Sequence, residues 1–187
     1  MLKRVLFYLV IPVLVVNVVI AASIRDISLE EMNEYFVVAK HFPTSHVNHT
    51  GAVEKVKLQR YFAGNSRVIY DYKGPKVDKY FPLHIRGMAY KTSHKVIARH
   101  LFKINSILSE WSITSNSGYK LEEEHIPISL GELQSVYRIV YNGETYGNLI
   151  LAKDKCTVYK YVIFGTYLQD EHWWNDVLPR IENVNTL

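Results

Sequence analysis

The chain has 187 residues, 48% of them hydrophobic, and a formal net charge of +4, so it is long enough for one domain with a sizeable core. Its basic residues are interspersed with acidic ones and form no basic stripe, which excludes nucleic acid as an expected partner. Cys156 is the only cysteine, so an internal disulfide is excluded and stability must come from the core.

The N-terminus has the order of charged, apolar and small residues that is typical of a secretory signal peptide. Lys3 and Arg4 precede an apolar run that starts at Val5 and ends in small residues. Signal peptidase accepts small side chains at its cleavage site, so we expect cleavage after Ala22 or Ser23. Loss of Lys3 and Arg4 would lower the formal charge from +4 to +2.

This pattern divides the chain into residues 1–22, a signal peptide, and residues 23–187, a single domain. The expected product is exported, either periplasmic or secreted. The apolar run over residues 5–22 is also about long enough to cross a thin bilayer. If it is not cleaved, it would anchor the protein in the inner membrane and give it a membrane association.

The first element expected after the leader is a helix. Ser28 and Glu31 have the spacing of a capping box, in which the serine hydroxyl and the glutamate satisfy backbone donors at the helix start. The helix is predicted to end near His41, before a polar loop at 43–51. Its apolar face would be formed by Leu29, Met32, Phe36 and Ala39.

Alternating apolar residues next predict β-strands in two groups. The first group is a hairpin within 53–72 followed by a strand at 83–90. The second group is a meander, because Asn142-Gly143 and Asp154-Lys155 are tight-turn pairs between its strands. The strands of this meander are predicted at 134–141, 145–153 and 156–164.

Two amphipathic helices complete the pattern. A central helix begins at Thr92 or Ser93, and a C-terminal helix begins near position 169. The fold class is therefore α+β, an antiparallel sheet of about five to six strands, with both helices expected on one side of it. The core-facing residues are predicted to be Ile97, Leu101, Ile104, Leu108 and Trp111 in the central helix and Trp174, Val177 and Ile181 in the C-terminal helix.

Residues 129–143 read as a Leu-Gly-acidic turn, a strand and an Asn-Gly hairpin, followed by Tyr146-Gly147-Asn148, Thr157-Val158-Tyr159 and a closing helix. This order resembles the C-terminal half of PsbP/Mog1-like α/β sandwich domains, including the extracellular sensor-type domains. The resemblance implies the same sandwich architecture and an accessory, sensing or docking role. It supplies no catalytic residues and no cofactor.

Aromatic residues are the first candidates for a binding surface, since the chain has fourteen tyrosines and three tryptophans. If the helices cover the valine side of the last strands, the tyrosines line an exposed sheet face. Tyrosine is also common on any half-exposed sheet, so strand propensity alone could explain the pattern. Trp173 is expected to be exposed because adjacent helical residues point about 100° apart and Trp174 continues the apolar stripe. The candidate binding residues are Tyr137, Tyr141, Tyr159, Tyr161 and Trp173.

Histidines are the candidates for metal or acid–base chemistry. His41, His46 and His49 lie in and beside the polar loop, where imidazoles could converge on zinc or copper. Their spacing fits no established metal motif, so solvated side chains are the favoured interpretation. His84 and Arg86 share one face of a strand, without a recognisable catalytic arrangement.

The sequence therefore predicts a non-catalytic binding, accessory or sensor module of the cell envelope that needs no cofactor. Its partner would be an envelope protein or a small ligand, recognised by the tyrosine-rich sheet face. Two alternatives remain open: a small secreted hydrolase or metal-dependent enzyme using the loop histidines, and a glycan-binding protein.

Overall fold

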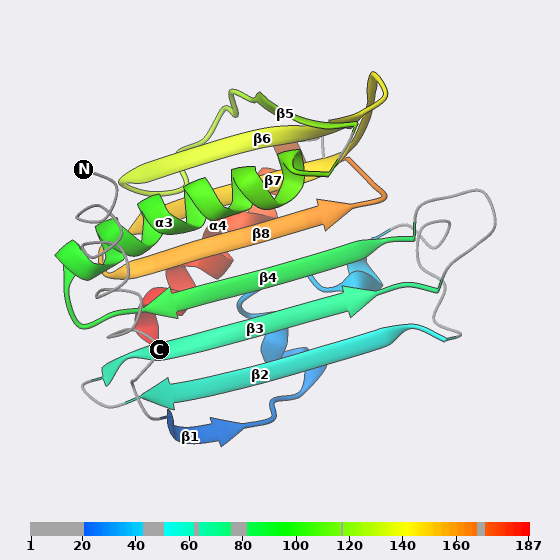
Figure 1. The fold of residues 1–187 in the computed structure, drawn as a ribbon. Coiled ribbons are helices and arrows are strands. Elements are labelled where there is room, and N and C mark those ends of the chain that lie inside the picture. The colour runs from blue at the N-terminus through cyan, green and yellow to red at the C-terminus, as the bar shows by residue number, and fades with distance from the viewer. Residues whose placement is uncertain (1–20, 43–50, 62–63, 76–81, 117, 168–170) are drawn as a thin grey trace.

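The computed structural model describes residues 21–42, 51–61, 64–75, 82–116, 118–167 and 171–187. Within them, eight strands form one antiparallel sheet (Figure 1). The strands are β1 (Ala21–Arg25), β2 (Val53–Tyr61), β3 (Ser66–Lys73), β4 (His84–Lys91), β5 (Tyr119–Glu123), β6 (Leu133–Tyr141), β7 (Glu144–Asp154) and β8 (Thr157–Phe164). The helical elements are α2 (Leu29–Met32), the short 3₁₀ turn η1 (Ala39–His41), α3 (Lys95–Thr114) and α4 (Glu171–Thr186).

The strand order is β1-β2-β3-β4-β8-β7-β6-β5, so the sheet consists of two meanders joined through β4 and β8. The α+β class and the antiparallel sheet are confirmed. The two strands beyond the expected number are the edge strands β1 and β5. Both are five residues long and β5 is rich in charged residues, so neither shows a clear apolar alternation. β1 also contains Ala21 and Ala22, the last two residues of the predicted signal peptide, whose residues 1–20 lie outside the described ranges.

The turns of the second meander confirm the hairpin predictions. Asn142 and Gly143 both have positive φ, 50° and 87°, as a tight turn between twisted strands requires. Lys155 has a φ of 48° at the next turn. This register places Val136, Ile150 and Tyr161 in one line across β6, β7 and β8.

The two long helices lie on opposite faces of the sheet, so the expectation that both cover one side is wrong. α3 connects β4 in the sheet centre to β5 at the edge, and it crosses the second meander on one face (Figure 1). It packs there on Leu149 and Val158. α4 follows β8 and lies behind the sheet, where Trp174 packs in the cluster that contains Ile150. Its predicted stripe is confirmed, because Trp174, Val177 and Ile181 are all buried.

The apolar face predicted for α3 is wrong by about a third of a turn. The residues that pack on the sheet are Ala98, Phe102, Ser109 and Ile113, whereas Leu108 and Trp111 are exposed. Small side chains at positions 98 and 109 let the helix backbone lie close to the sheet. The larger aliphatic residues, which dominate the sequence pattern, consequently point away from it.

Residues 27–42 form the second cover of the back face, together with α4. The Ser28 hydroxyl accepts a hydrogen bond from the Glu31 amide at 3.1 Å, which confirms the helix cap. The predicted helix nevertheless ends at Met32 and not at His41. The chain then runs through Tyr35 to Ala39 in a buried, mostly non-helical path. Val37 and Val38 are β-branched, which disfavours helix, and both are buried.

Three sheet tyrosines satisfy the backbone polar groups of this buried segment. The hydroxyl of Tyr159 donates to the carbonyl of Tyr35 at 3.2 Å, and the hydroxyl of Tyr161 donates to the carbonyl of Val37. The Ala39 amide donates to the hydroxyl of Tyr70 at 2.7 Å. Unpaired backbone groups in a core are costly, so these hydroxyls allow an irregular segment to be buried on a sheet. We refer to these three residues as the tyrosine clamp.

Phe36 lies at the centre of the clamp. Its ring stacks on Tyr159 at 5.0 Å and on Tyr161 at 5.7 Å between centroids. The ring lies over Gly87 of β4, where a Cβ atom would approach it to 2.6 Å. Glycine at position 87 is thus required by the close approach of the Phe36 ring.

The clamp predicts a specific response to alkaline pH. Burial raises the pKa of Tyr70, Tyr159 and Tyr161 above the ordinary value of 10.0. In the unfolded chain the same phenols ionise near pH 10, so the free energy of unfolding falls as the pH rises above that value. An ultraviolet titration should show at least three tyrosines that ionise only as the protein unfolds, since Tyr72 and Tyr90 also have raised pKa values. Complete tyrosine ionisation with the fold intact would contradict the clamp.

The same hydroxyls can be removed individually. Tyr161→Phe leaves the Val37 carbonyl unpaired in the core, and should lower the free energy of unfolding by about 1–3 kcal/mol. Urea denaturation measures the change. Tyr137→Phe is the matched control, because Tyr137 is a half-buried tyrosine on the other face of the sheet.

Candidate functional site

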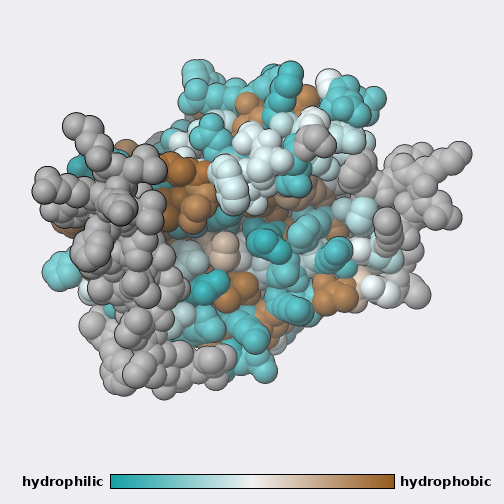
Figure 2. All heavy atoms as spheres, viewed as in Figure 1, coloured by the Kyte–Doolittle hydropathy of each residue, from teal (hydrophilic) through white to brown (hydrophobic). Residues whose placement is uncertain are grey.

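The face of the sheet that carries α3 is covered over only half its width. α3 lies over the second meander, and none of the described helices covers β2, β3 and β4 on this side (Figure 1). Figure 2 shows a hydrophilic band there, beside the apolar side chains of α3. Among the described residues of β2, β3 and β4 that point to this side, Asp71 is the one acidic residue. The basic residues on it are Lys55, Lys57, Arg67, Lys73 and Arg86, with His84 beside them.

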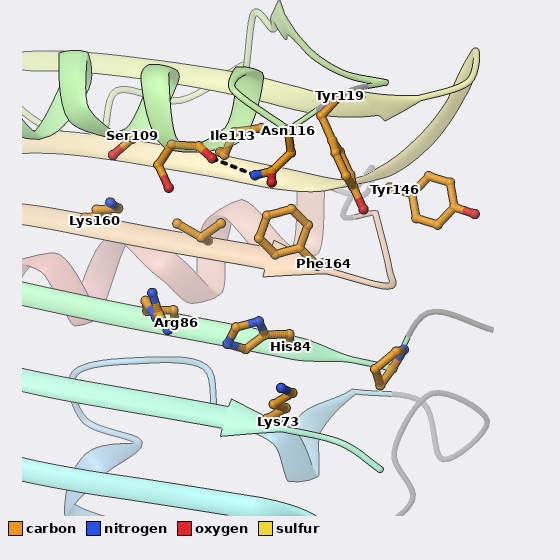
Figure 3. Close-up of a pocket in the computed structure, with 13 residues that line it drawn as sticks. Lys73, His84, Arg86, Ser109, Ile113, Asn116, Tyr119, Tyr146, Lys160 and Phe164 are labelled. Atoms are coloured by element: carbon orange, nitrogen blue, oxygen red, sulfur yellow. Dashed lines mark hydrogen bonds between the residues drawn. The ribbon is translucent and has the colours of Figure 1, made fainter. Parts of the chain in front are cut away.

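A groove of about 410 Å³ lies where this open face meets the C-terminal half of α3. Its floor is formed by β4 and β8, and the last turns of α3 form one wall (Figure 3). A volume of this size is in the range of small-molecule sites. The cationic or titratable side chains that line it are Lys73, His84, Arg86 and Lys160, and the apolar ones include Ile113, Val162 and Phe164.

Asp71 holds two of these side chains in place. Its Oδ1 atom lies 3.1 Å from Nε2 of His84 and 3.6 Å from Nε of Arg86. The His84 ring is also stacked against Phe164, with 6.2 Å between the centroids. The Asp71 carboxylate is therefore shared by His84 and Arg86. These contacts fix the His84 ring and the Arg86 guanidinium at the floor of the groove.

Lys160 has no such partner. It lies on β8 in register with Met88 of β4, and most of its side chain is buried. Desolvation, and secondly the positive charge of Arg86, lower the pKa of Lys160 below its ordinary value of 10.5. Among the described residues, no carboxylate lies within ion-pair distance of either Lys160 or Lys73. A largely buried ammonium without a counter-ion is unfavourable, and it marks where a bound anion would be stabilised.

Polar and aromatic groups form the upper edge of the groove. The Asn116 amide donates to the Ser112 carbonyl at 2.9 Å and closes the end of α3 (Figure 3). Tyr119 of β5 lies edge-on to Phe164, with 6.2 Å between the centroids. Tyr146 also lines the groove. The site thus combines cations at its floor with rings and amide groups at its edge.

The structure separates the predicted binding tyrosines. Tyr159 and Tyr161 are fully buried in the clamp, so the expectation that they lie on an exposed face is wrong. The reason is the register of β6, β7 and β8, which aligns Val136 with Tyr161 and not with Val158. Tyr159 and Tyr161 therefore lie on the sheet face that residues 27–42 and α4 cover.

The other two predicted tyrosines lie on the α3 side. Tyr137 is half-buried against the cluster under α3. Tyr141 packs on Tyr119, with 4.7 Å between ring centroids, and edge-on against Tyr146. Tyr141 consequently supports two rings that line the groove.

Trp173 is half-buried, since its ring stacks on Phe42 with 5.1 Å between centroids. The expectation of an exposed ring is therefore wrong, and the reason is that residues 27–42 extend far enough to cover it. Trp174 is buried, as predicted.

The loop histidines give no assembled site in the described structure. His41 is exposed in η1, where its Nδ1 atom lies 3.2 Å from the Val38 carbonyl oxygen. His46 and His49 lie outside the described residues. Within the described ranges, no group of three histidine, cysteine or acidic residues could hold a metal ion.

The sequence indicated His84 and Arg86 as neighbours on one strand, but it did not indicate the residues that complete the groove. Lys73 and Lys160 come from two strands that are distant in sequence, and the β3-β4-β8 order brings them together. The available signal was a polar residue at every second position of strands that otherwise read as buried.

Comparisons of the chain with protein-family models, curated proteins and solved structures give no match. The resemblance to PsbP/Mog1-like domains therefore stays a prediction. In the described part of the chain, no helix is both long and apolar enough to cross a membrane.

Lys160 should reduce stability in the unliganded protein. Lys160→Met keeps the length of the side chain and removes the buried charge, so the melting temperature should rise at neutral pH. Because the pKa is lowered by folding, the difference from wild type should shrink as the pH approaches 10.5. Lys73→Met, at an exposed lysine of the same groove, is the control and should change little. A lower melting temperature for Lys160→Met at neutral pH would contradict this account of the groove.

Proposed function

We propose that this protein is a non-catalytic binding module whose groove between α3, β4 and β8 holds an anionic ligand with an apolar or aromatic part. The observation that carries the proposal is Lys160, a mostly buried cation without a counter-ion in the described structure. A bound carboxylate or phosphate would supply the missing charge, with the neighbouring Arg86 as a second donor. Hydrogen bonds to such charged groups are among the stronger ones in proteins.

The apolar walls define the rest of the ligand. Ile113, Val162 and Phe164 line the same groove as the cations, so a purely polar ion would leave them in contact with water. The volume accommodates a molecule with one or two rings. An amphipathic anion therefore matches the groove better than a neutral sugar does, which places the glycan-binding alternative second.

The arrangement favours binding over catalysis. His84 and Asp71 have the geometry of a base and its orienting acid, at 3.1 Å. Among the described residues, however, no hydroxyl or thiol forms a hydrogen bond to the His84 ring. The ring is instead stacked on Phe164, and Asp71 is shared with Arg86. We infer a positioning role for this pair.

We also propose that the module works outside the cytosol, as an envelope accessory or sensor protein. The support is the leader pattern of residues 1–22. A ligand site without catalytic groups suits a sensor, in which occupancy itself is the signal.

Naphthyl phosphate is a direct probe, since it joins a double ring to a dianion, and naphthol is the matched neutral compound. Calorimetric titration should detect binding of the phosphate and little binding of naphthol. Lys160→Met should weaken phosphate binding by about tenfold or more, because the buried charge pair is lost. Lys57→Met, at an exposed lysine on the same face, should leave the affinity nearly unchanged.

Two results would contradict the proposal. Equal affinity of wild type and Lys160→Met for the phosphate would remove the groove as the site. Steady release of naphthol by the purified protein, abolished in His84→Gln, would instead show a hydrolase that uses the groove histidine, which differs from the alternative based on the loop histidines.

A further inference from the structure

The outer face of α3 is apolar over most of the helix length. Trp111 is 69% exposed, Ile107 64% and Leu108 54%. With 3.6 residues per turn, these three and four further apolar residues fall within an arc of about 140°, which also contains the exposed His100 and has the partly buried Leu101 at its edge toward the sheet. We call this set the α3 stripe, and it consists of Val96, Ile97, Leu101, Ile104, Ile107, Leu108 and Trp111.

The α3 stripe is not an ordinary scatter of exposed apolar residues. Single exposed hydrophobic side chains are normal, but a row of them along about four turns of one helix is unusual for a free surface. The sheet side of α3 is occupied by Ala98, Phe102 and Ile113, and Leu101 is the one stripe residue that packs against the same cluster. Figure 2 shows apolar side chains of α3 facing outward beside the hydrophilic band.

The polar surroundings of the stripe are basic. Arg99 and Lys103 lie along one flank of α3, and neither forms an ion pair among the described residues. Glu110, the only acidic residue of the helix, lies on the same flank, which therefore carries two cations and one anion. The other flank faces the groove and the open sheet face, with Arg86 and Lys160. Apolar side chains with a tryptophan, between flanking cations, are the composition of helices that lie in the interface of an anionic membrane.

We propose that the α3 stripe associates with the surface of an anionic lipid bilayer, with the helix axis parallel to the membrane plane. Leu108 and Trp111 would enter the boundary between headgroups and acyl chains, and Arg99 and Lys103 would contact the anionic headgroups. The charge of this side argues for lipid over a second copy of the chain. Two copies meeting through α3 would bring their basic sheet faces toward each other.

This inference is independent of the ligand proposed for the groove, and it concerns residues other than the apolar leader. A leader that is retained would hold the protein near a membrane without fixing its orientation. The α3 stripe would determine which side of the sheet faces the bilayer, and would place the groove mouth beside it.

Trp111 provides a readout that the leader cannot give, because residues 1–22 contain no tryptophan. The full chain is mixed with vesicles of phosphatidylcholine alone or with phosphatidylglycerol added. The spectrum of Trp111→Phe is used to subtract Trp173 and Trp174. The Trp111 emission should shift to shorter wavelength with the anionic vesicles, and added salt should weaken the effect.

Substitution on the stripe tests the apolar contribution. Ile107→Ser combined with Leu108→Ser should lower the vesicle partition measured by Trp111 about tenfold, because both exposed side chains lose their transfer into lipid. Val53→Ser, at an exposed valine on β2, is the matched control and should leave partition unchanged. These positions are exposed, so the fold is preserved, as circular dichroism would verify.

Two results would overturn the proposal. The first is a Trp111 emission that does not change with anionic vesicles, or changes equally with phosphatidylcholine alone. The second is an emission shift that follows protein concentration without lipid, together with a dimer in sedimentation, which would identify a second copy as the occupant of the stripe.

Discussion

The architecture depends on one constraint: an irregular segment is buried on a β-sheet, and its backbone must find hydrogen-bond partners there. The tyrosine clamp provides them from β3 and β8, at Tyr70, Tyr159 and Tyr161. α4 continues the same pattern, since Arg180 donates to the Asn33 carbonyl at 3.0 Å and Asn183 donates to that of Glu34 at 2.9 Å. Along the segment, α4 thus holds residues 33–34 and the sheet tyrosines hold residues 35–39.

This arrangement decides where a ligand can bind. The back face is closed by Phe36, the clamp and α4, so the accessible chemistry lies on the side of α3. α3 covers only the second meander, and its edge runs beside the open, basic strands of the first. The groove forms at that edge. Its most buried cation, Lys160, has no counter-ion among the described residues, so we expect it to reduce the stability of the unliganded protein. Residues at functional sites commonly lower stability in this way.

The sequence predicts local features well, but it predicts poorly which side of a helix or strand faces the core. The Ser28 cap, the Asn142-Gly143 turn and the apolar stripe of α4 depend on neighbouring residues, and the structure confirms each of them. The face that α3 presents to the sheet depends on how close two elements can approach. Size and hydrophobicity along the chain favoured Leu108 over Ala98, whereas close packing selected the smaller residue.

The candidate site illustrates the same limit. His84 and Arg86 could be seen as neighbours on one strand, but Lys160 joins them only because β8 pairs with β4. The sequence showed that tyrosines are abundant in the strands. It did not show that three of them bind the backbone of residues 35–39. A segment rich in apolar residues that is buried without regular structure has no periodicity from which its partners could be predicted.

The most direct measurement of this account is amide hydrogen exchange at Ala39, whose N–H donates to the Tyr70 hydroxyl in the buried segment. We predict exchange as slow as that of amides in β4 and β8, which open only with global unfolding. Exchange as fast as that of the exposed turn residue Gly143, under conditions where β4 and β8 stay protected, would contradict the clamp.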